Sequence, residues 1–313
     1  METDPQQLPH SDSPLAPPKG HTGYVALLGR PNTGKSTFLN TVLGCHLAAV
    51  SSKPQTTRKS FLGIYNDDDS QIIFLDAPGV HPAKIAIDEA MSESVSKVLE
   101  DADLVVCLVD PTRPSGEEDG MVAQLASSCG KRVLLVLNKC DVSTPQQRRD
   151  ALKFYRESLP EAECLEMTAT DRESAGRLIG RLKELLPVDL LLYDREEVTT
   201  AYERDIAAEL IREAVLELLH QEIPHAIAVT LDSWNATAEG VEIEATLILE
   251  REAHKGMVIG QGGKMIKAIR HRAVKKISEL CQGGWVKLDL SIRVIPNWRK
   301  HKQFLKNIRL WEE

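Results

Sequence analysis

Residues 29–37, with the sequence GRPNTGKST, constrain the fold of this chain more than any other stretch. They fit the phosphate-binding pattern G-x-x-x-x-G-K-[ST]. The apolar run 24–28 precedes them and predicts a buried strand, and residues 37–43 follow with apolar side chains at helical spacing. A strand, a glycine turn and a helix N-terminus place several backbone N–H groups around one anion. In an unrelated chain the same pattern can be only a loop. Here the flanking strand and helix favour phosphate binding.

Two side chains of this motif suit a nucleoside triphosphate. The Lys35 ammonium is a point charge for the β- and γ-phosphates, and the Ser36 hydroxyl is placed to ligate Mg²⁺. Asn32 is a candidate for binding a monovalent cation such as K⁺, and a turn or capping asparagine is the open alternative. The other expected nucleotide contacts in the motif are Gly29, Arg30, Pro31, Thr33, Gly34 and Thr37.

A second motif, Asp76-Ala77-Pro78-Gly79, follows the apolar run 72–75, which predicts another strand. An acid at such a strand end can hold Mg²⁺ through its water shell. Gly79 allows the backbone to approach a γ-phosphate and to move when that phosphate leaves. Alone the tetrapeptide is usually a turn, and its place after the phosphate motif gives it weight.

The residue after this motif is Val80, which we also expect to contact the nucleotide. Ras-type GTPases carry a glutamine there to orient the attacking water. Valine has no group for that task. Turnover is therefore expected to be slow, or the water is held by another element or by a bound cation.

Residues 55–58, with the sequence QTTR, lie between the two motifs. A threonine in such a loop can add its hydroxyl to Mg²⁺ and order the segment when the γ-phosphate is present. We favour Thr57, with Thr56 as the alternative. Lys35, Thr57 and Gly79 are thus the residues expected to assist hydrolysis, and Ser36, Thr57 and Asp76 the expected metal ligands.

A third motif, Asn138-Lys139-Cys140-Asp141, ends the apolar run 133–137 and reads N-K-x-D. Guanine presents two adjacent donors, N1–H and the 2-amino group, and one carboxylate, that of Asp141, can accept both. Adenine lacks this pair and would leave the carboxylate unpaired. Asn138 is expected to join neighbouring loops and the Lys139 stem to lie over the base. The backbone N–H of Ala169, in residues 168–170, is a further expected contact to guanine O6. Together the three motifs favour GTP over ATP.

The order of apolar runs predicts two domains of different class. Residues 23–187 alternate strands and helices, which indicates an α/β domain with a mainly parallel sheet. Residues 188–201 read as a linker, and residues 1–22 as a disordered tail without targeting features. Strands are expected at 24–28, 72–75, 104–109, 133–137 and 164–167, and helices include 88–99 and 123–128.

Residues 202–313 predict an α+β domain. A helix over 202–220 stops before Pro224. A loop holding Gly256, Gly260, Gly262 and Gly263 leads into a basic helix over 264–280. Alternating strands are expected at 226–231, 241–249 and 286–294.

The glycine loop has the pattern G-x-x-G and precedes the basic helix, which is how KH domains clamp about four nucleotides. The expected RNA contacts are Gly260, Gln261, Gly262, Gly263, Lys264, Lys267 and Arg270, with Arg272, Lys275 and Lys276 adding positive charge. Trp285 and Trp298 are possible stacking platforms, and we favour a buried core position for Trp285.

Charge is divided unevenly along the chain. Residues 254–309 hold fourteen Lys and Arg against Glu279 and Asp289, a local charge of +12, so the rest sums to −20 within the net charge of −8. Such a bias favours a surface for RNA or anionic lipid over a merely solvated helix face. No apolar run is long enough to span a membrane. The six cysteines lack C-x-x-C spacing and indicate reduced, mostly buried thiols in a cytoplasmic protein.

In these motifs the chain resembles the Era-type GTPases, which belong to the TrmE–Era–EngA group and carry a C-terminal type II KH domain. The resemblance rests on residues 29–37, 55–58, 76–81, 138–141 and 258–266, and spans residues 23–294. It implies a monomeric GTPase that uses GTP, GDP and Mg²⁺. It also implies binding to the 3′ end of 16S ribosomal RNA in the GTP form and assistance in assembly of the small (30S) ribosomal subunit. Some relatives associate peripherally with the inner membrane.

Three segments depart from the family pattern: Ala77 replaces a threonine, residues 168–170 replace a Ser-Ala-Leu, and residues 296–313 match poorly. The last segment can extend the RNA surface or pack on the domain. Two other functions stay open as alternatives. One is a GTPase that docks on anionic membrane through its basic half, coupling to the cell cycle or metabolism. The other is a metabolic NTPase, for which no acceptor site is evident in the sequence.

Overall fold

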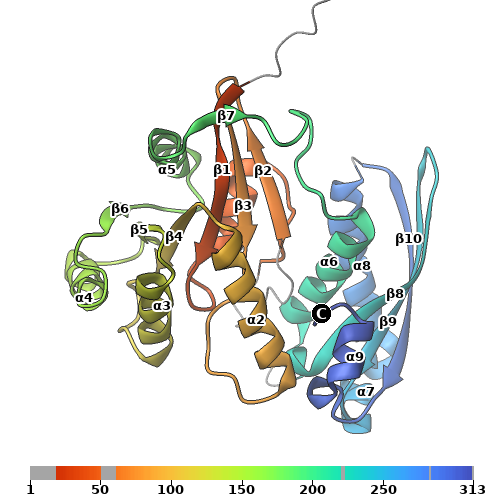
Figure 1. Cartoon of the computed structure of the whole chain (residues 1–313). Coiled ribbons are helices and arrows are strands. Elements are labelled where there is room, and N and C mark those ends of the chain that lie inside the picture. The colour runs from red at the N-terminus through yellow and green to blue at the C-terminus, as the bar shows by residue number, and fades with distance from the viewer. Residues whose placement is uncertain (1–18, 51–60, 220–222, 282, 312–313) are drawn as a thin grey trace, which may run out of the picture.

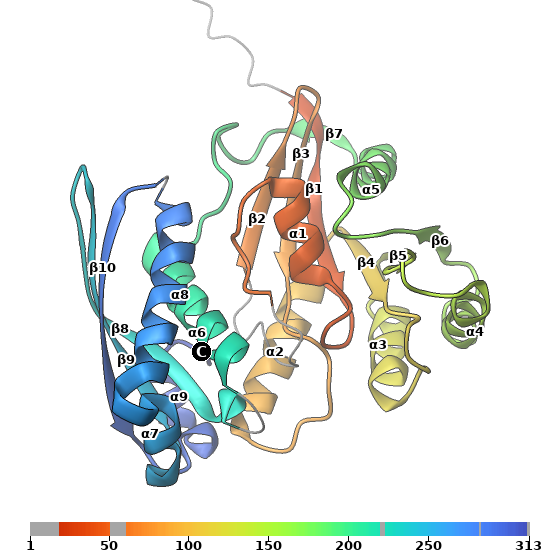
Figure 2. The same ribbon diagram turned by 180° about the vertical axis from the view of Figure 1, so that it is seen from behind.

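The structure is a computed structural model that describes residues 19–50, 61–219, 223–281 and 283–311 (Figures 1 and 2). The first half builds a seven-stranded sheet in the order β2-β3-β1-β4-β5-β6, with β7 added to β1. The pairs among β3, β1, β4, β5 and β6 are parallel, whereas β2 and β7 pair antiparallel with β3 and β1. The strands are β1 (Lys19–Leu28), β2 (Phe61–Asn66), β3 (Ser70–Asp76), β4 (Leu104–Val109), β5 (Arg132–Leu137), β6 (Glu163–Glu166) and β7 (Val188–Leu190).

Helices cover both faces of this sheet because successive side chains of each strand point to opposite faces. Val25 and Leu27 of β1 pack in one cluster with α1 and α5, and Figure 2 shows α1 lying over that face. Ala26 and Leu28 pack in a second cluster with α2, α3 and α4. These helices are α1 (Lys35–Leu43), α2 (Ala86–Asp101), α3 (Glu117–Ser128), α4 (Pro145–Arg156) and α5 (Arg172–Leu185).

The second half builds a three-stranded sheet in the order β10-β9-β8, in which β9 and β10 are parallel and β8 and β9 antiparallel. Helices α6 and α8 lie side by side against this sheet (Figure 1). Ile269, Ala273 and Ile277 of α8 are fully buried at helical spacing, so the opposite side of α8 faces solvent. The elements are α6 (Glu203–Leu218), β8 (Ile227–Ala236), β9 (Gly240–Leu249), α7 (Glu252–Ile259), α8 (Lys264–Leu280), β10 (Trp285–Val294) and α9 (Lys302–Asn307).

The C-terminal segment packs between the two halves. Trp298 and Leu305 are buried in a cluster with Ile87 and Met91 of α2. The Trp298 indole Nε1–H donates to the carbonyl of Ala226 at 3.1 Å. Residues 296–313 were expected either to extend the RNA surface or to pack on the domain, and Trp298 and Leu305 pack.

Several expectations from the sequence need correction. β1 starts at Lys19, inside the expected tail, and β7 lies inside the expected linker 188–201. Residues 252–259, expected as part of a loop, form α7. The expected core position of Trp285 is wrong, because Trp285 is 43% exposed, whereas Trp298 is buried. All six cysteines are free, but only Cys107 is fully buried. Residues 1–18 of the expected tail and residues 55–58, including Thr56 and Thr57, lie outside the described residues.

Candidate nucleotide site and glycine-loop surface

The loop of residues 29–34 joins β1 to α1 and has a conformation that depends on glycine. Gly34 has φ +99°, and a β-carbon there would lie 2.3 Å from Asn138 Nδ2. A β-carbon on Gly29 would lie 2.6 Å from the Leu108 carbonyl oxygen. Around it, Pro31 and Thr33 are buried and Thr37 is half-buried on α1. The backbone is therefore packed too tightly for side chains at these glycines, as an anion cradle of backbone amides requires.

Lys35 opens α1 and lies across this loop. Its Nζ donates to the carbonyl oxygens of Gly29 at 3.0 Å and Arg30 at 3.2 Å. Burial lowers the pKa of Lys35 to about 8, and the nearby Asp76 carboxylate offsets only part of that effect. A phosphate beside this ammonium would favour the charged form and restore its pKa.

Asp76, at the end of β3, faces Ser36. The Ser36 hydroxyl donates to Asp76 Oδ2 at 3.0 Å. Asp76 Oδ1 is buried and, among the described residues, has no hydrogen-bond partner. Burial raises the pKa of Asp76 to about 6, with Lys35 and Ser36 acting in the opposite direction. An unpaired carboxylate oxygen beside a serine hydroxyl is a donor set that suits Mg²⁺, so these residues fit the expected metal.

The segment after Asp76 lies directly against the phosphate loop. Ala77 and Pro78 are buried, and the Val80 amide donates to the Gly29 carbonyl at 3.1 Å. A β-carbon on Gly79 would lie 2.7 Å from the Pro31 backbone. A change in the phosphate loop is thus transmitted to residues 79–80 by direct contact.

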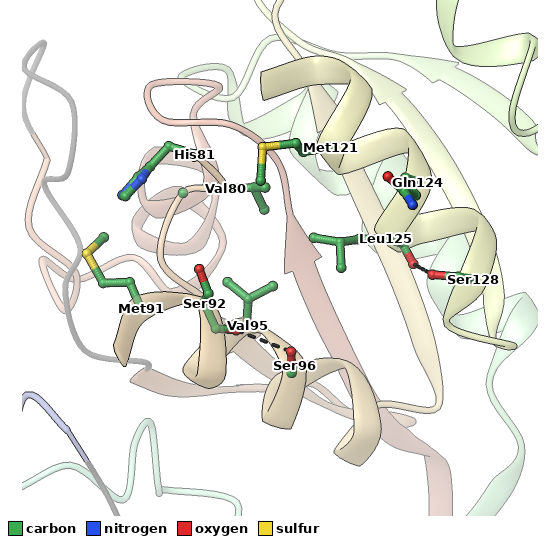
Figure 3. Close-up of a pocket in the computed structure, with 11 residues that line it drawn as sticks. Val80, His81, Met91, Ser92, Val95, Ser96, Met121, Gln124, Leu125 and Ser128 are labelled. Atoms are coloured by element: carbon green, nitrogen blue, oxygen red, sulfur yellow. Dashed lines mark hydrogen bonds between the residues drawn. The ribbon is translucent and has the colours of Figure 1, made fainter. Parts of the chain in front are cut away.

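The Val80 side chain lines a pocket of about 310 Å³ between α2 and α3 (Figure 3). Its apolar neighbours there include Met91, Val95, Met121 and Leu125. The hydroxyls of Ser92, Ser96 and Ser128 in the same pocket donate to carbonyls of their own helices. Val80 is therefore part of an apolar wall.

Asn138 joins three loops. Its Nδ2 donates to the Thr33 carbonyl at 2.7 Å, and its Oδ1 accepts from the Ala169 amide at 2.9 Å. The amide of Ala169 is thus committed to Asn138 in this structure, and its expected contact with guanine O6 stays a prediction. Asp141 is exposed beside this loop, and its Oδ1 accepts from the Thr168 hydroxyl at 3.4 Å.

Lys139 and Cys140 complete the third motif. The Lys139 Nζ donates to the Asn32 carbonyl at 2.8 Å and to Asp110 Oδ2 at 2.7 Å. Cys140 is half-buried, its thiol donates to the Leu137 carbonyl, and burial raises its pKa. Asn32 itself has a left-handed backbone with φ +65°, as a turn asparagine has.

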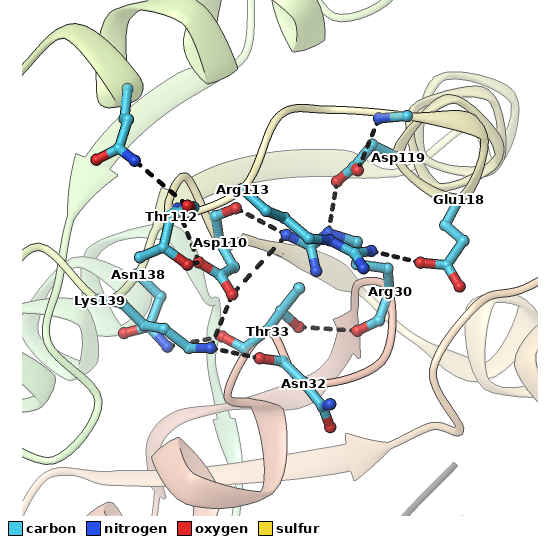
Figure 4. Close-up of polar contacts among 12 residues, drawn as sticks. Arg30, Asn32, Thr33, Asp110, Thr112, Arg113, Glu118, Asp119, Asn138 and Lys139 are labelled. Atoms are coloured by element: carbon cyan, nitrogen blue, oxygen red, sulfur yellow. Dashed lines mark hydrogen bonds and ion pairs between the residues drawn. The ribbon is translucent and has the colours of Figure 1, made fainter. Parts of the chain in front are cut away.

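Two acids of this region were not identified from the sequence. Asp110 follows β4, and Asp119 lies in the first turn of α3; both are buried and contact the side chain of Arg30 (Figure 4). Asp110 had a usable signal, because an acid directly after an apolar run marks the carboxyl edge of a parallel sheet. Arg30 was expected to contact nucleotide, but its guanidinium points into this buried cluster.

The glycine loop of the second half lies between α7 and α8. Gly260, Gly262 and Gly263 have φ values of +71°, +60° and +76°. A β-carbon on Gly260 would lie 2.7 Å from Met265, whereas one on Gly262 or Gly263 would meet no atom within 4 Å. The loop therefore requires glycine for its backbone and leaves open space on its outer side.

The basic side chains beside this loop differ in their pairing. Arg270 lies 3.8 Å from Asp289, Arg272 3.4 Å from Glu217, and Lys276 is paired with Glu213 and Glu217. Lys264 and Lys267 are exposed, as is Gln261, and within the described residues neither lysine has an acidic partner. Lys264 and Lys267 at the glycine-loop end of α8, and the exposed Lys275 further along it, thus carry charge that no acidic partner among the described residues compensates.

The described part of the chain has no helix long and apolar enough to cross a bilayer. Residues 24–139 match the family described as 50S ribosome-binding GTPase, and residues 222–299 match the family described as KH domain. GTPase Era of Lacticaseibacillus paracasei is 37% identical over 289 residues, covering 92% of this chain and 96% of that protein.

Two solved structures are similar over nearly the whole chain. A variant of Aquifex aeolicus Era bound to GDP·AlF4⁻ has 30% identity and a TM-score of 0.86, covering 93% of this chain and 100% of that one. Era in complex with MgGDPNP and nucleotides 1506–1542 of 16S ribosomal RNA has 30% identity and a TM-score of 0.87, covering 94% and 100%. These comparisons confirm the expected α/β GTPase domain followed by a KH domain.

Proposed function

The chain belongs to the Era family of GTPases, and from that premise we propose that it binds and slowly hydrolyses GTP and binds ribosomal RNA through its KH domain. We further propose that it assists assembly of the small ribosomal subunit. One observation carries this most: the chain spans all of a relative whose structure holds MgGDPNP and nucleotides 1506–1542 of 16S ribosomal RNA. Both candidate sites are present here on one chain.

The nucleotide site would work through charge and fixed backbone. The amides around Gly34 and the Lys35 ammonium would bind the phosphates, and Asp141 would accept the two donors of guanine. Ser36 and Asp76 would hold Mg²⁺, with Thr57 as the proposed third protein ligand. Bound Mg²⁺ would supply charge neutralisation on the phosphate oxygens.

Hydrolysis is expected to be slow because the residue after Gly79 cannot orient water. Val80 belongs to the apolar wall between α2 and α3 and carries no hydrogen-bonding group. Asn32 stays a candidate for binding K⁺ through its side chain. Comparing GTP hydrolysis in K⁺ and in Na⁺, for the native chain and Asn32→Ala, tests that role. Equal rates in all four conditions would exclude it.

The RNA site would combine a glycine loop with exposed positive charge. Gly262 and Gly263 face open space at the N-terminus of α8, where a sugar-phosphate backbone can approach. Lys264, Lys267 and Arg270 would add electrostatic affinity. We propose that the chain acts in the cytoplasm as a monomer, with peripheral membrane docking as the alternative.

The proposal is tested by RNA binding of a glycine-loop variant. The substitutions Gly260→Asp and Gly263→Asp together add two negative charges to the loop. We expect them to abolish binding of an RNA with the 3′-terminal sequence of 16S ribosomal RNA, measured by fluorescence anisotropy with GDPNP and Mg²⁺. Unchanged RNA affinity would exclude the KH role.

A matched control is Gly176→Asp with Gly180→Asp. Both glycines are exposed on α5, and a β-carbon on either meets no atom within 4 Å. This pair adds the same charge away from the loop and should retain RNA binding. Sedimentation with anionic vesicles tests the membrane alternative, which predicts that the native chain binds vesicles and that the native chain and both variants bind RNA poorly.

A further inference from the structure

The side chain of Arg30 connects the phosphate loop to α3 and to the residue that follows β4. It is 2% exposed, and its Nε–H donates to Asp119 Oδ1 at 3.0 Å (Figure 4). Its Nη2 donates to the Asp110 carbonyl at 2.9 Å and lies 3.8 Å from Asp110 Oδ2. A planar guanidinium can serve two acceptors on different elements in this way, whereas an ammonium is a single point charge.

Asp110 is shared between the phosphate loop and the base motif. Besides Arg30 it contacts Lys139, whose Nζ donates to its Oδ2 at 2.7 Å. Its Oδ1 accepts from the Thr112 amide at 2.9 Å and from the Thr112 hydroxyl at 2.6 Å. Although burial acts to raise it, these hydrogen bonds hold the pKa of Asp110 below its usual range.

The far end of the cluster is anchored in the helical layer. Asp119 Oδ1 also accepts from the Tyr155 hydroxyl of α4 at 2.9 Å, and Asp119 Oδ2 accepts from the Gly116 amide, which precedes α3, at 3.1 Å. Arg30 and Lys139 balance the charges of Asp110 and Asp119. Removal of Arg30 leaves two buried acids with one cation, so the cluster must rearrange.

The backbone of Arg30 takes part in the phosphate loop itself. Its carbonyl accepts from Lys35 Nζ at 3.2 Å and from the Thr33 hydroxyl at 3.1 Å. The position of Lys35 therefore depends on where the Arg30 backbone lies, and the buried guanidinium fixes that backbone.

We propose that Arg30 is a positioning residue for guanine nucleotide binding, holding the phosphate loop and, through Asp110, Lys139 of the base motif in one rigid unit. This inference rests on the proposed function. Arg30 contacts no nucleotide atom in this role. It sets the distance between the phosphate loop and the base motif. These two loops must contact the phosphates and the base of one nucleotide at the same time.

The test compares GDP with IDP, which lacks the 2-amino group that Asp141 would accept. Dissociation constants are measured by displacement of a fluorescent GDP in the presence of Mg²⁺. For Arg30→Ala we expect GDP affinity to fall about 10- to 100-fold, the worth of a hydrogen bond to a charged group. We also expect the ratio of IDP to GDP dissociation constants to fall, because Lys139 and its loop lose part of their support.

Two controls separate positioning from general stability. Arg113→Ala removes a 50% exposed arginine of the same region, which pairs with Glu118 outside the cluster, and should leave both constants unchanged. Tyr155→Phe removes a hydrogen bond at the far end of the cluster and should lower the melting temperature with a much smaller effect on GDP affinity. Arg30→Lys keeps the charge but not both contacts, and should fall between Arg30→Ala and the native chain.

The outcomes are distinct. If Arg30→Ala and Arg30→Lys fold, shown by circular dichroism, and retain native GDP affinity, the proposal is wrong. If GDP and IDP affinities fall by the same factor, the link to the base motif is wrong. If Arg30→Ala fails to fold, the ratio in Arg30→Lys decides. A native chain that binds no GDP would contradict the proposed function instead.

Discussion

Each half of this molecule has a glycine loop ahead of a helix at its proposed binding site, and the surroundings of the two loops differ. The loop before α1 is packed against Asn138 and Leu108, and its Lys35 is 6% exposed. The loop before α8 lies at the surface, and Lys264 beside it is exposed. Both have glycines at positive φ, so the local backbone device is the same.

The difference lies in what each loop can recognise. A buried loop joined to other loops by side chains suits one compact anion with a defined base. An open loop on a basic helix suits a polymer whose phosphates repeat along it. We therefore expect nucleotide binding to depend on individual atoms, and RNA binding to depend on charge and salt.

The largest effect is expected for Asp141→Asn at the nucleotide site. The amide cannot accept both guanine donors but suits xanthine, so GTP affinity should fall roughly 10³-fold or more while xanthosine triphosphate affinity rises. Competition against a fluorescent nucleotide measures both. Asp150→Asn, an exposed acid on α4, is the control. A variant that still prefers GTP would show that Asp141 does not read the base.

Alanine at one glycine of each loop tests the comparison directly. A β-carbon on Gly34 would lie 2.3 Å from Asn138 Nδ2 and break its bond to Thr33, so Gly34→Ala should weaken GDP binding roughly 100-fold. At Gly262 nothing lies within 4 Å, so Gly262→Ala should weaken RNA binding only a few-fold, through backbone strain. Equal losses of GDP affinity and RNA affinity would show that the two loops do not differ in how closely they are packed. Gly176→Ala on α5 is the control for both measurements.

Salt should affect the RNA site more than the nucleotide site, whereas the alanine substitutions affect the nucleotide site more. If three to four phosphates contact the basic end of α8, raising salt from about 50 to about 200 mM should weaken RNA binding roughly 20- to 50-fold. GDP binding with Mg²⁺ should change much less. Titrations of both ligands across this range measure the two slopes. A flat RNA slope would contradict an electrostatic RNA surface.

The smallest predicted effect is a pH dependence of nucleotide binding. Burial lowers the pKa of Lys35 to about 8 in the free chain, and bound phosphate would raise it. Binding thus takes up a proton above about pH 8, so GDP affinity should fall as pH rises, by up to about tenfold per pH unit. Just below pH 8 it should be nearly constant, until the Asp76 carboxylate, with a pKa of about 6, begins to take up a proton. Calorimetry in two buffers of different ionisation enthalpy measures the proton uptake on GDP binding. No proton uptake at pH 9 would contradict this prediction.

The sequence predicted what depends on local pattern. Apolar runs such as 104–109 coincide with β4, and the motifs follow strand ends because a parallel sheet brings its carboxyl ends to one edge. α7 was missed because Gly256 suggested a loop, although the helix continues through it. β2 was missed because Gly63 interrupts a short run whose strand character comes from pairing with β3.

Side-chain direction was the part that local pattern could not supply. Arg30 stands in a nucleotide motif yet points into a buried cluster, because Asp110 and Asp119 reach it from elements distant in sequence. Trp298 is buried because α2, β8, β9 and α9 surround it, and Trp285 is 43% exposed at the start of β10. Such positions depend on tertiary packing, which a single sequence does not reveal.

The resemblance to Era-type GTPases predicts RNA binding in the GTP form, so we propose that the guanine nucleotide state controls the RNA-binding surface. The most direct measurement is the affinity of the full chain for an RNA with the 3′-terminal sequence of 16S ribosomal RNA, with saturating GDPNP and Mg²⁺ and again with GDP and Mg²⁺. We predict binding at least about fivefold tighter with GDPNP, the usual range of coupling between two sites. Equal affinity in the two nucleotide states would contradict the claim.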